Sequence, residues 1–199
     1  MSSNNSMLEE VRPRIFEQEA TGLLSDLMGC PAIGSHLMFA DEDGLKRAKN
    51  YIVDVLQQCY AARQIKLSVV CDQSNANDLI GYALTFHRPG YPDLCYCHKI
   101  FVYEQHRGYG AGSRLLANLK EKFKGLGLLC PPDKVSFYTR AGMENLGPLS
   151  LPDDEYFQIT RHMYVGLNIM AQGEMSVGEM PIFMLNDDDA RNIMALLSS

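Results

Sequence analysis

The feature that most constrains this chain is a glycine-rich turn between a strand-like segment and a helix-like segment. Residues 100–103 form an apolar run typical of a buried strand, and Gly108, Gly110 and Gly112 follow it. The next segment is helical in pattern, because four apolar residues share one face: Leu115, Leu116, Leu119 and Phe123. A helix that begins after glycines can bind an anion, since its first N–H groups are unpaired and its dipole makes that end positive. We therefore expect a ligand that carries a phosphate or pyrophosphate.

Three kinds of phosphate site use such a turn: P-loops, dinucleotide folds and coenzyme A sites. A P-loop requires Gly-Lys-Ser/Thr, whereas Gly112 is followed by Ser113 and Arg114. The dinucleotide fingerprint Gly-x-Gly-x-x-Gly does not match the spacing of these glycines. The pattern that remains is Arg-x-x-Gly-x-Gly, at residues 107–112.

This segment resembles the coenzyme A pyrophosphate loop of the GNAT superfamily of N-acetyltransferases. A second segment, residues 135–143 (VSFYTRAGM), is similar to the family's late helix and to the turn into its next strand. Together the two motifs extend the resemblance over roughly residues 66–165. The resemblance implies acetyl-coenzyme A as cosubstrate and a mixed sheet flanked by helices.

The resemblance also implies roles for individual residues. The strand backbone at Phe101, Val102 and Tyr103 would hold the pantetheine arm as an added strand. Arg107 would lie at the rim of the pyrophosphate site. The loop that holds the pyrophosphate consists of Gly108, Tyr109, Gly110, Ala111, Gly112 and Ser113. Tyr138 matches the family's tyrosine that protonates the departing thiolate, and a phenol pKa of about 10 is close enough to a thiol's for that transfer.

The general base is expected on the strand before the loop. Strict alternation gives two faces, one with Tyr96, His98, Ile100 and Val102 and the other with Cys95, Cys97, Lys99 and Phe101. The run is also similar to the arylalkylamine N-acetyltransferase branch, in which two histidines relay the amine's proton through water, and Tyr96 and His98 hold those positions here. His98 is expected to titrate near neutrality and to act as base. Glu104, or a water chain, is the alternative.

The rest of the pattern predicts the order of elements. Helices are expected at residues 14–28 and 44–62, and strands at 65–71, 78–87, 94–103, 126–130 and 156–165. Residues 1–13 are expected to be flexible or to form an edge strand. Residues 166–199 form a C-terminal extension, packed on the domain or on a partner subunit, which can hold a strand at 181–185 and a last helix capped at Asn186–Asp189. We expect one α/β (α+β) domain over residues 1–199, with a mixed, mostly antiparallel central sheet flanked by helices.

Composition excludes several classes of function. The chain has 199 residues, a formal net charge of −6 and no basic block, so nucleic-acid binding is not expected. It shows no secretory signal and no apolar stretch near the ~18 residues of a membrane span, and six cysteines without a disulfide pattern favour the cytoplasm. No metal is expected, because the Cys95-x-Cys97-His98 segment lacks a second pair of ligands.

These observations predict an acetyl-CoA-dependent N-acetyltransferase that acts on a primary amine of a small molecule. Direct attack in a ternary complex needs no covalent enzyme intermediate, so positioning and proton transfer carry the chemistry. Two alternatives stay open. One is acetylation of a protein or aminoacyl-tRNA amine, and the other is a non-catalytic coenzyme A-binding regulatory module. A homodimer is compatible with the C-terminal extension.

Overall fold

The computed structural model describes residues 2–72, 78–87, 90–151, 153, 157–175 and 185–198. Its contacts divide the chain into two compact units. The first contains Met1–Pro13, Cys59–Pro148 and Gly166–Pro181, and the second contains Arg14–Gln58, Leu149–Val165 and Ile182–Ser199. One domain over the whole chain therefore stays a prediction.

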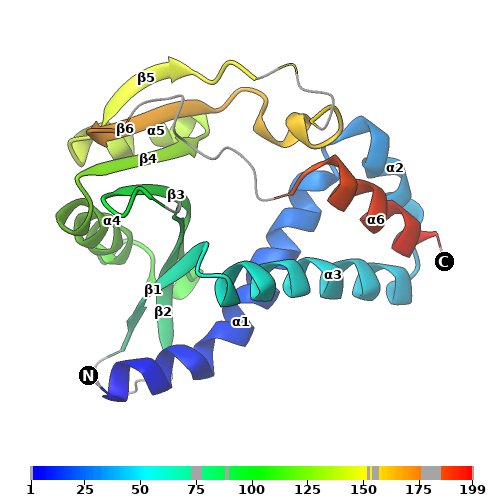
Figure 1. Cartoon of the computed structure of the whole chain (residues 1–199), viewed down its shortest axis with the longest axis horizontal. Coiled ribbons are helices and arrows are strands. Elements are labelled where there is room, and N and C mark those ends of the chain that lie inside the picture. Colours follow the sequence, from blue (N-terminus) through cyan, green and yellow to red (C-terminus); the bar gives the residue numbers. More distant parts are fainter. Residues whose placement is uncertain are drawn as a thin grey trace. The chain divides into compact units, whose positions relative to one another are not determined.

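The first unit is built on a six-stranded sheet of described residues (Figure 1). Its strands are β1 (Ile65–Cys71), β2 (Leu79–Phe86), β3 (Leu94–Val102), β4 (Gly125–Cys130), β5 (Glu144–Pro148) and β6 (Asn168–Gly173). Their order in the sheet is β1-β2-β3-β4-β6-β5, and each neighbouring pair is antiparallel except β3 and β4. This mixed, mostly antiparallel sheet confirms the predicted fold class, and β1 to β4 agree with the predicted strands to within one residue at each end.

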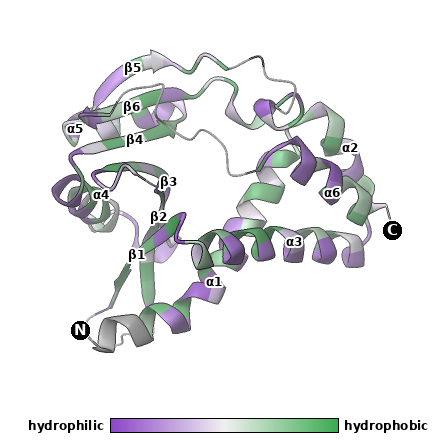
Figure 2. Ribbon diagram, viewed as in Figure 1, coloured by the Kyte–Doolittle hydropathy of each residue, from purple (hydrophilic) through white to green (hydrophobic). Residues whose placement is uncertain are grey.

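Two helices flank this sheet, α4 (Ala111–Lys122) and α5 (Val135–Arg140). The predicted apolar face of α4 is buried in a core formed with residues of β2, β3, β4 and β6. The members of this core in the helix and in β3 and β4 are Leu115, Leu116, Leu119, Cys95, Cys97, Leu126, Leu128 and Cys130. Figure 2 shows β2 and β4 in the green of apolar residues, as expected for strands in which most residues are buried.

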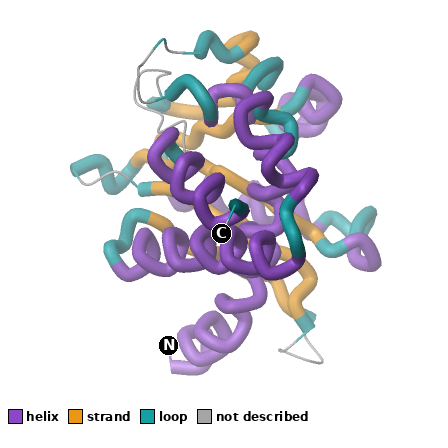
Figure 3. Tube along the Cα trace, turned by 90° about the vertical axis from the view of Figure 1, so that its right-hand side faces the viewer, coloured by secondary structure: helices purple, strands orange, loops and turns teal. Residues whose placement is uncertain are grey.

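The described secondary structure of the second unit is helical, drawn as purple tubes in Figure 3. Its helices are α2 (Pro31–Phe39), α6 (Asp187–Leu197), the short 3-10 helix η3 (Thr160–Tyr164) and parts of α1 (Ser2–Leu27) and α3 (Glu42–Ala61). The predicted cap of α6 is confirmed, because Asn186 and Asp189 form a reciprocal capping box. Within this unit α6 packs on α3, since Tyr51 Oη donates to Asp189 at 2.7 Å.

Two predicted elements are wrong. Residues 2–13, expected to be flexible or a strand, belong to α1, which runs through Pro13. In place of the strand expected at 156–165, the described residues hold the 3-10 helix η3 at Thr160–Tyr164. Where this helix begins, the buried Asp187 carboxylate accepts hydrogen bonds from the N–H groups of Gln158, Ile159 and Thr160 at 2.6–3.0 Å. The sheet is completed by β6 instead. The strand expected at 181–185 lies almost entirely outside the described residues.

No helix of the described chain is both long enough and apolar enough to cross a membrane.

His87, just after β2, is a half-buried histidine with an unusual environment. Its Nε2 lies 3.0 Å from Thr85 Oγ1, and its ring lies 5.1 Å from the ring of Phe123. Burial, and then the nearby Lys66 and Lys122 ammonium groups, lowers its pKa from 6.5 to about 4. His87 is therefore neutral in the folded protein at neutral pH.

We expect this histidine to destabilise the fold in mild acid. The unfolded chain binds a proton near pH 6.5 and the folded chain only near pH 4, so stability is lost as pH falls through that window and is constant below it. The loss by pH 4 is on the order of 2–3 kcal/mol. Urea unfolding at pH 7 and 4.5 measures it, and His87→Gln, which cannot titrate, should lessen the acid loss by about the contribution of His87. The loss that remains includes that of His98, whose pKa is lowered to about 3 by burial. The exposed His36→Gln is the control, and an equal acid loss in both variants would contradict the assignment to His87.

Candidate active site

The glycine-rich loop joins β3 to α4 through the one-turn 3-10 helix η1 (Glu104–His106). Gly108 and Gly110 have φ values of +84° and +79°, in the region that favours glycine. No described atom lies within 4 Å of a Cβ built on either residue, so each faces open space. Arg107 is held beside the loop by its Nε, which donates to the Val102 carbonyl at 3.0 Å. The loop therefore has the shape of an open cradle.

The N-terminus of α4 is left without a cap. Gly110 is its N-cap residue, no side chain of the described residues caps it, and its first turn contains no acidic residue. By contrast, α6 has a capping box and three aspartates in its first turn. The first N–H groups of α4 thus remain available to an external anion, and the helix dipole favours one there.

A cavity of about 350 Å³ opens on this helix end. Its lining residues are Val102, His106, Arg107, Gly108, Gly110, Ala111, Gly112, Ser113 and Phe137. A second cavity of about 620 Å³ continues between α4 and α5, and Ser113 and Phe137 line both. His106 is one of the lining residues, and its Nε2 atom is enclosed and has no hydrogen-bond partner among the described residues.

The strands β3 and β4 separate beside this cavity. Their parallel pairing begins at Leu94 with Gly125 and ends at Cys97 with Leu128. Beyond that pair the described parts of the two strands are no longer paired with each other, although β3 continues to Val102. The edge of β3 that is freed in this way can accept an added strand, as the sequence predicted for a pantetheine arm.

The alternation predicted along β3 is wrong beyond His98. Leu84 of β2 pairs with Lys99 and Thr85 pairs with Cys97, so His98 is an extra residue, a β-bulge. The bulge reverses the faces. Ile100 packs with Cys95 and Cys97 in the core, whereas Phe101 lies on the opposite face. Val102 also faces α4, because a Cβ built on Gly112 would lie 3.6 Å from it.

His98 lies on the face opposite α4, half-buried against Phe86 with ring centres 5.8 Å apart. Burial, and then the Lys99 ammonium, lowers its pKa to about 3. The expectation that His98 titrates near neutrality is therefore wrong. At neutral pH its imidazole is uncharged and can accept a hydrogen bond, but it holds a proton weakly.

Tyr138 lies on the other side of the same strands. It is half-buried in α5, packs against the core that contains Cys97 and Cys130, and meets the Phe137 ring edge-on at 5.0 Å. Burial, and then the neighbouring Cys97 and Cys130 thiols, raises its pKa above the ordinary value of 10. The phenol therefore stays protonated where the two strands separate, as a proton donor must.

Some of the other predicted site residues line the first cavity, and others do not. Most of the predicted loop lines the first cavity, but Tyr109 is 82% exposed and does not. Phe101 and Tyr103 contact each other at 5.0 Å, away from the cavity lining. Glu104 is exposed at the start of η1. Sequence reasoning missed His106 and Phe137, although each directly precedes a residue that it singled out.

A mixed sheet that separates beside an uncapped, glycine-initiated helix is the architecture of acetyltransferases that bind coenzyme A. The sequence matches the model of the acetyltransferase (GNAT) family over residues 36–143, more than half of its length. The chain therefore belongs to the GNAT acetyltransferase family, which confirms the resemblance. A search of curated proteins found no significant match.

Several solved structures are similar to this chain. Nourseothricin acetyltransferase is 19% identical with a TM-score of 0.40, and the match covers 55% of this chain and 64%, less than two thirds, of that one. A mutant of spermidine N-acetyltransferase SpeG from Vibrio cholerae is 16% identical with a TM-score of 0.47, covering 62% and 73%. PaiA N-acetyltransferase from Thermoplasma acidophilum, in complex with coenzyme A, is 12% identical with a TM-score of 0.43, covering 79% and 94%.

Proposed function

We propose that this protein transfers the acetyl group of acetyl-coenzyme A to a primary amine of a small molecule, by direct attack in a ternary complex. The observation that carries the proposal is the uncapped N-terminus of α4, which opens through a glycine cradle into a cavity beside the freed edge of β3. The loop N–H groups and Arg107 would bind the pyrophosphate. The β3 backbone from residue 99 onward would bind the pantetheine amides.

The residues present fit this cosubstrate. A Cβ at Gly108 or Gly110 would fill the space that a pyrophosphate needs, and the His106 imidazole provides a further polar group at the wall. When bound, acetyl-coenzyme A supplies the acetyl group as a thioester. No metal is needed for the proposed reaction, because a proton donor and a proton acceptor are both provided by side chains.

The two candidate proton-transfer groups lie on opposite faces of β3, close to where it parts from β4. Tyr138 is on the face of α4 and α5, where it would donate its proton to the sulfur of the departing thiolate. His98 is on the opposite face, at the bulge, where it would accept a hydrogen bond from the attacking amine. An acid and a base on opposite sides of the reacting carbonyl suit a single displacement step. Glu104, acting through water, remains the alternative base.

A thiol-release assay with product identification tests the proposal. The protein would be incubated with acetyl-CoA and a panel of aryl amines, alkylamines, polyamines and amino acids, and the acetylated amine identified by mass spectrometry. Release with one small amine supports the proposal. Release only with a peptide or an aminoacyl-tRNA would support the macromolecular acceptor. Binding of coenzyme A without release on any acceptor would support a non-catalytic module.

We expect the pH profile of kcat/KM to show no ionisation near pH 6.5, since burial lowers the pKa of His98 to about 3. The profile should instead follow the deprotonation of the acceptor amine. His98→Asn should lower kcat about tenfold without moving the profile, because general base catalysis by a weakly basic group is modest. An acidic limb near pH 6–7 that disappears in His98→Asn would contradict the low pKa of His98.

A further inference from the structure

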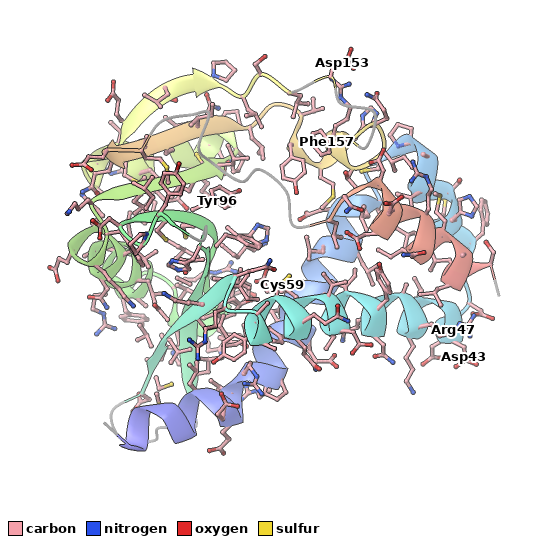
Figure 4. The ribbon with its side chains drawn as sticks, viewed as in Figure 1. Asp43, Arg47, Cys59, Tyr96, Asp153 and Phe157 are labelled. Carbon is pink, nitrogen blue, oxygen red and sulfur yellow. The ribbon has the colours of Figure 1, made fainter. Side chains whose placement is uncertain are left out.

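Five rings line the face of β2 and β3 that lies opposite α4. Tyr82 stacks on Phe101 with ring centres 5.3 Å apart, and Phe86 contacts Tyr96 at 6.0 Å and His98 at 5.8 Å. We call these five residues, Tyr82, Phe86, Tyr96, His98 and Phe101, the aromatic face. Figure 4 labels Tyr96, which lies on β3. The candidate base is thus a member of this face, so an acceptor at His98 would also contact its rings.

The aromatic face is only partly covered. Tyr82 and Tyr96 are buried, whereas Phe86, His98 and Phe101 are half-buried, so each of these three residues keeps part of its surface exposed. Aromatic rings with exposed surface bind another ring by stacking or edge-to-face contact. The face therefore offers a surface for a flat, apolar group directly beside the candidate base.

The charges of this face are unfavourable for a cationic ligand. The strands β1, β2 and β3 contain no aspartate and no glutamate, and their charged residues are Lys66 and Lys99. Lys99 pairs with Leu84, two residues along each strand from the Tyr82–Phe101 pair, and so lies on the same side of the sheet as the aromatic face. Aromatic rings attract cations, but a lysine among them repels an ammonium group and no strand carboxylate compensates for it.

We propose that the acceptor is an uncharged aromatic amine of low basicity, bound with its ring on the aromatic face and its nitrogen at His98, and not an alkylammonium or a polyamine. The inference rests on the proposed function, because it names the substrate class of that same site. An aryl amine is neutral at pH 7 and needs no carboxylate. Its ring matches the exposed surfaces of Phe86 and Phe101.

The proton balance of the reaction agrees with this acceptor. The amine nitrogen uses its lone pair to form a C–N bond with the acetyl carbon, the C–S bond breaks, and the sulfur takes a proton from Tyr138. The nitrogen then loses one proton, through His98 or water to solvent, and the phenol is reprotonated from solvent. An alkylammonium would first have to lose a proton with a pKa near 10, and the half-buried His98, whose pKa is about 3, is unsuited to remove it.

Two probes with the same ring test the proposal: 4-methylaniline, which is neutral at pH 7, and 4-methylbenzylamine, which is cationic. Each is titrated calorimetrically into protein saturated with coenzyme A, and kcat/KM is measured with acetyl-CoA. We expect the aniline to bind at least about tenfold more tightly at pH 7. Its kcat/KM should be flat between pH 6 and 8, whereas that of the benzylamine should rise about tenfold per pH unit as the free amine forms.

Variants of Phe86 separate ring contact from general packing. Phe86→Leu should weaken aniline binding three- to tenfold, and Phe86→Tyr, which keeps the ring, should restore it. Tighter binding of 4-methylbenzylamine or spermidine at pH 7, or equal aniline binding by both Phe86 variants, would overturn the proposal. Absence of thiol release with every amine would instead count against the proposed function, and the calorimetric comparison would still decide between the two probes.

Discussion

Tyr138→Phe is expected to lower kcat by at least about a hundredfold at saturating acetyl-CoA, while the Kd of coenzyme A stays unchanged. A positioned general acid contributes roughly 10²–10⁴ to a rate, and phenylalanine removes only the hydroxyl that would donate the proton. The substituted ring can keep its edge-on contact with Phe137, because that contact is made by the two rings, and phenylalanine remains an apolar residue at the edge of the core. Binding and folding should therefore be preserved.

Steady-state kinetics and calorimetry on the same preparations measure the two effects separately. Tyr91→Phe is the matched control, since it removes a hydroxyl from an exposed tyrosine of the first unit outside the proposed site. An unchanged kcat in Tyr138→Phe would remove the acid role from this residue. A parallel loss of coenzyme A binding would show that the hydroxyl acts in binding instead.

Gly110→Val is expected to weaken coenzyme A binding at least about a hundredfold. The residue has a φ of +79°, which a β-branched side chain resists, and its Cβ would point into the open space of the cradle. The strain would move the first N–H groups of α4 away from a pyrophosphate, and the side chain would block access to them. Since no described atom lies within 4 Å of the added Cβ, the core itself is not disturbed.

Gly90→Val is the control for backbone strain. Gly90 has a φ of +88° and open space around its Cβ, but it lies in the turn before β3 and not in the loop. Both variants should lose similar thermal stability, and only Gly110→Val should lose coenzyme A binding. Equal binding by the two variants would show that the glycine-rich loop does not hold the pyrophosphate.

Most of the strands of the first unit, and the helix α4, could be predicted from local sequence patterns. The strands β1 to β4 and the helix α4 could be predicted because each has its own periodicity. The loop could be predicted from its glycines, of which Gly108 and Gly110 adopt positive φ values. The start of α1 was missed although Val11 and Ile15, four residues apart, are both buried, a spacing that continues the helical stripe across Pro13.

Other features depend on partners that are distant in the sequence. The bulge at His98 is set by the register with β2, so the exchange of faces at Ile100 and Phe101 has no signal in β3 itself. The start of the 3-10 helix at Thr160 depends on Asp187, more than twenty residues later, which accepts hydrogen bonds from the N–H groups of Gln158, Ile159 and Thr160. The low pKa of His98 likewise follows from burial, which no local pattern reveals.

A calorimetric comparison of acetyl-CoA with acetyl-pantetheine tests the central claim most directly. Acetyl-pantetheine keeps the thioester and the amides but lacks the pyrophosphate. We expect acetyl-CoA to bind at one site per chain with a micromolar Kd, and acetyl-pantetheine to bind at least about a hundredfold more weakly, because the anion contacts of α4 are lost. Equal affinities, or no binding of acetyl-CoA, would contradict the assignment of this helix end as the cosubstrate site.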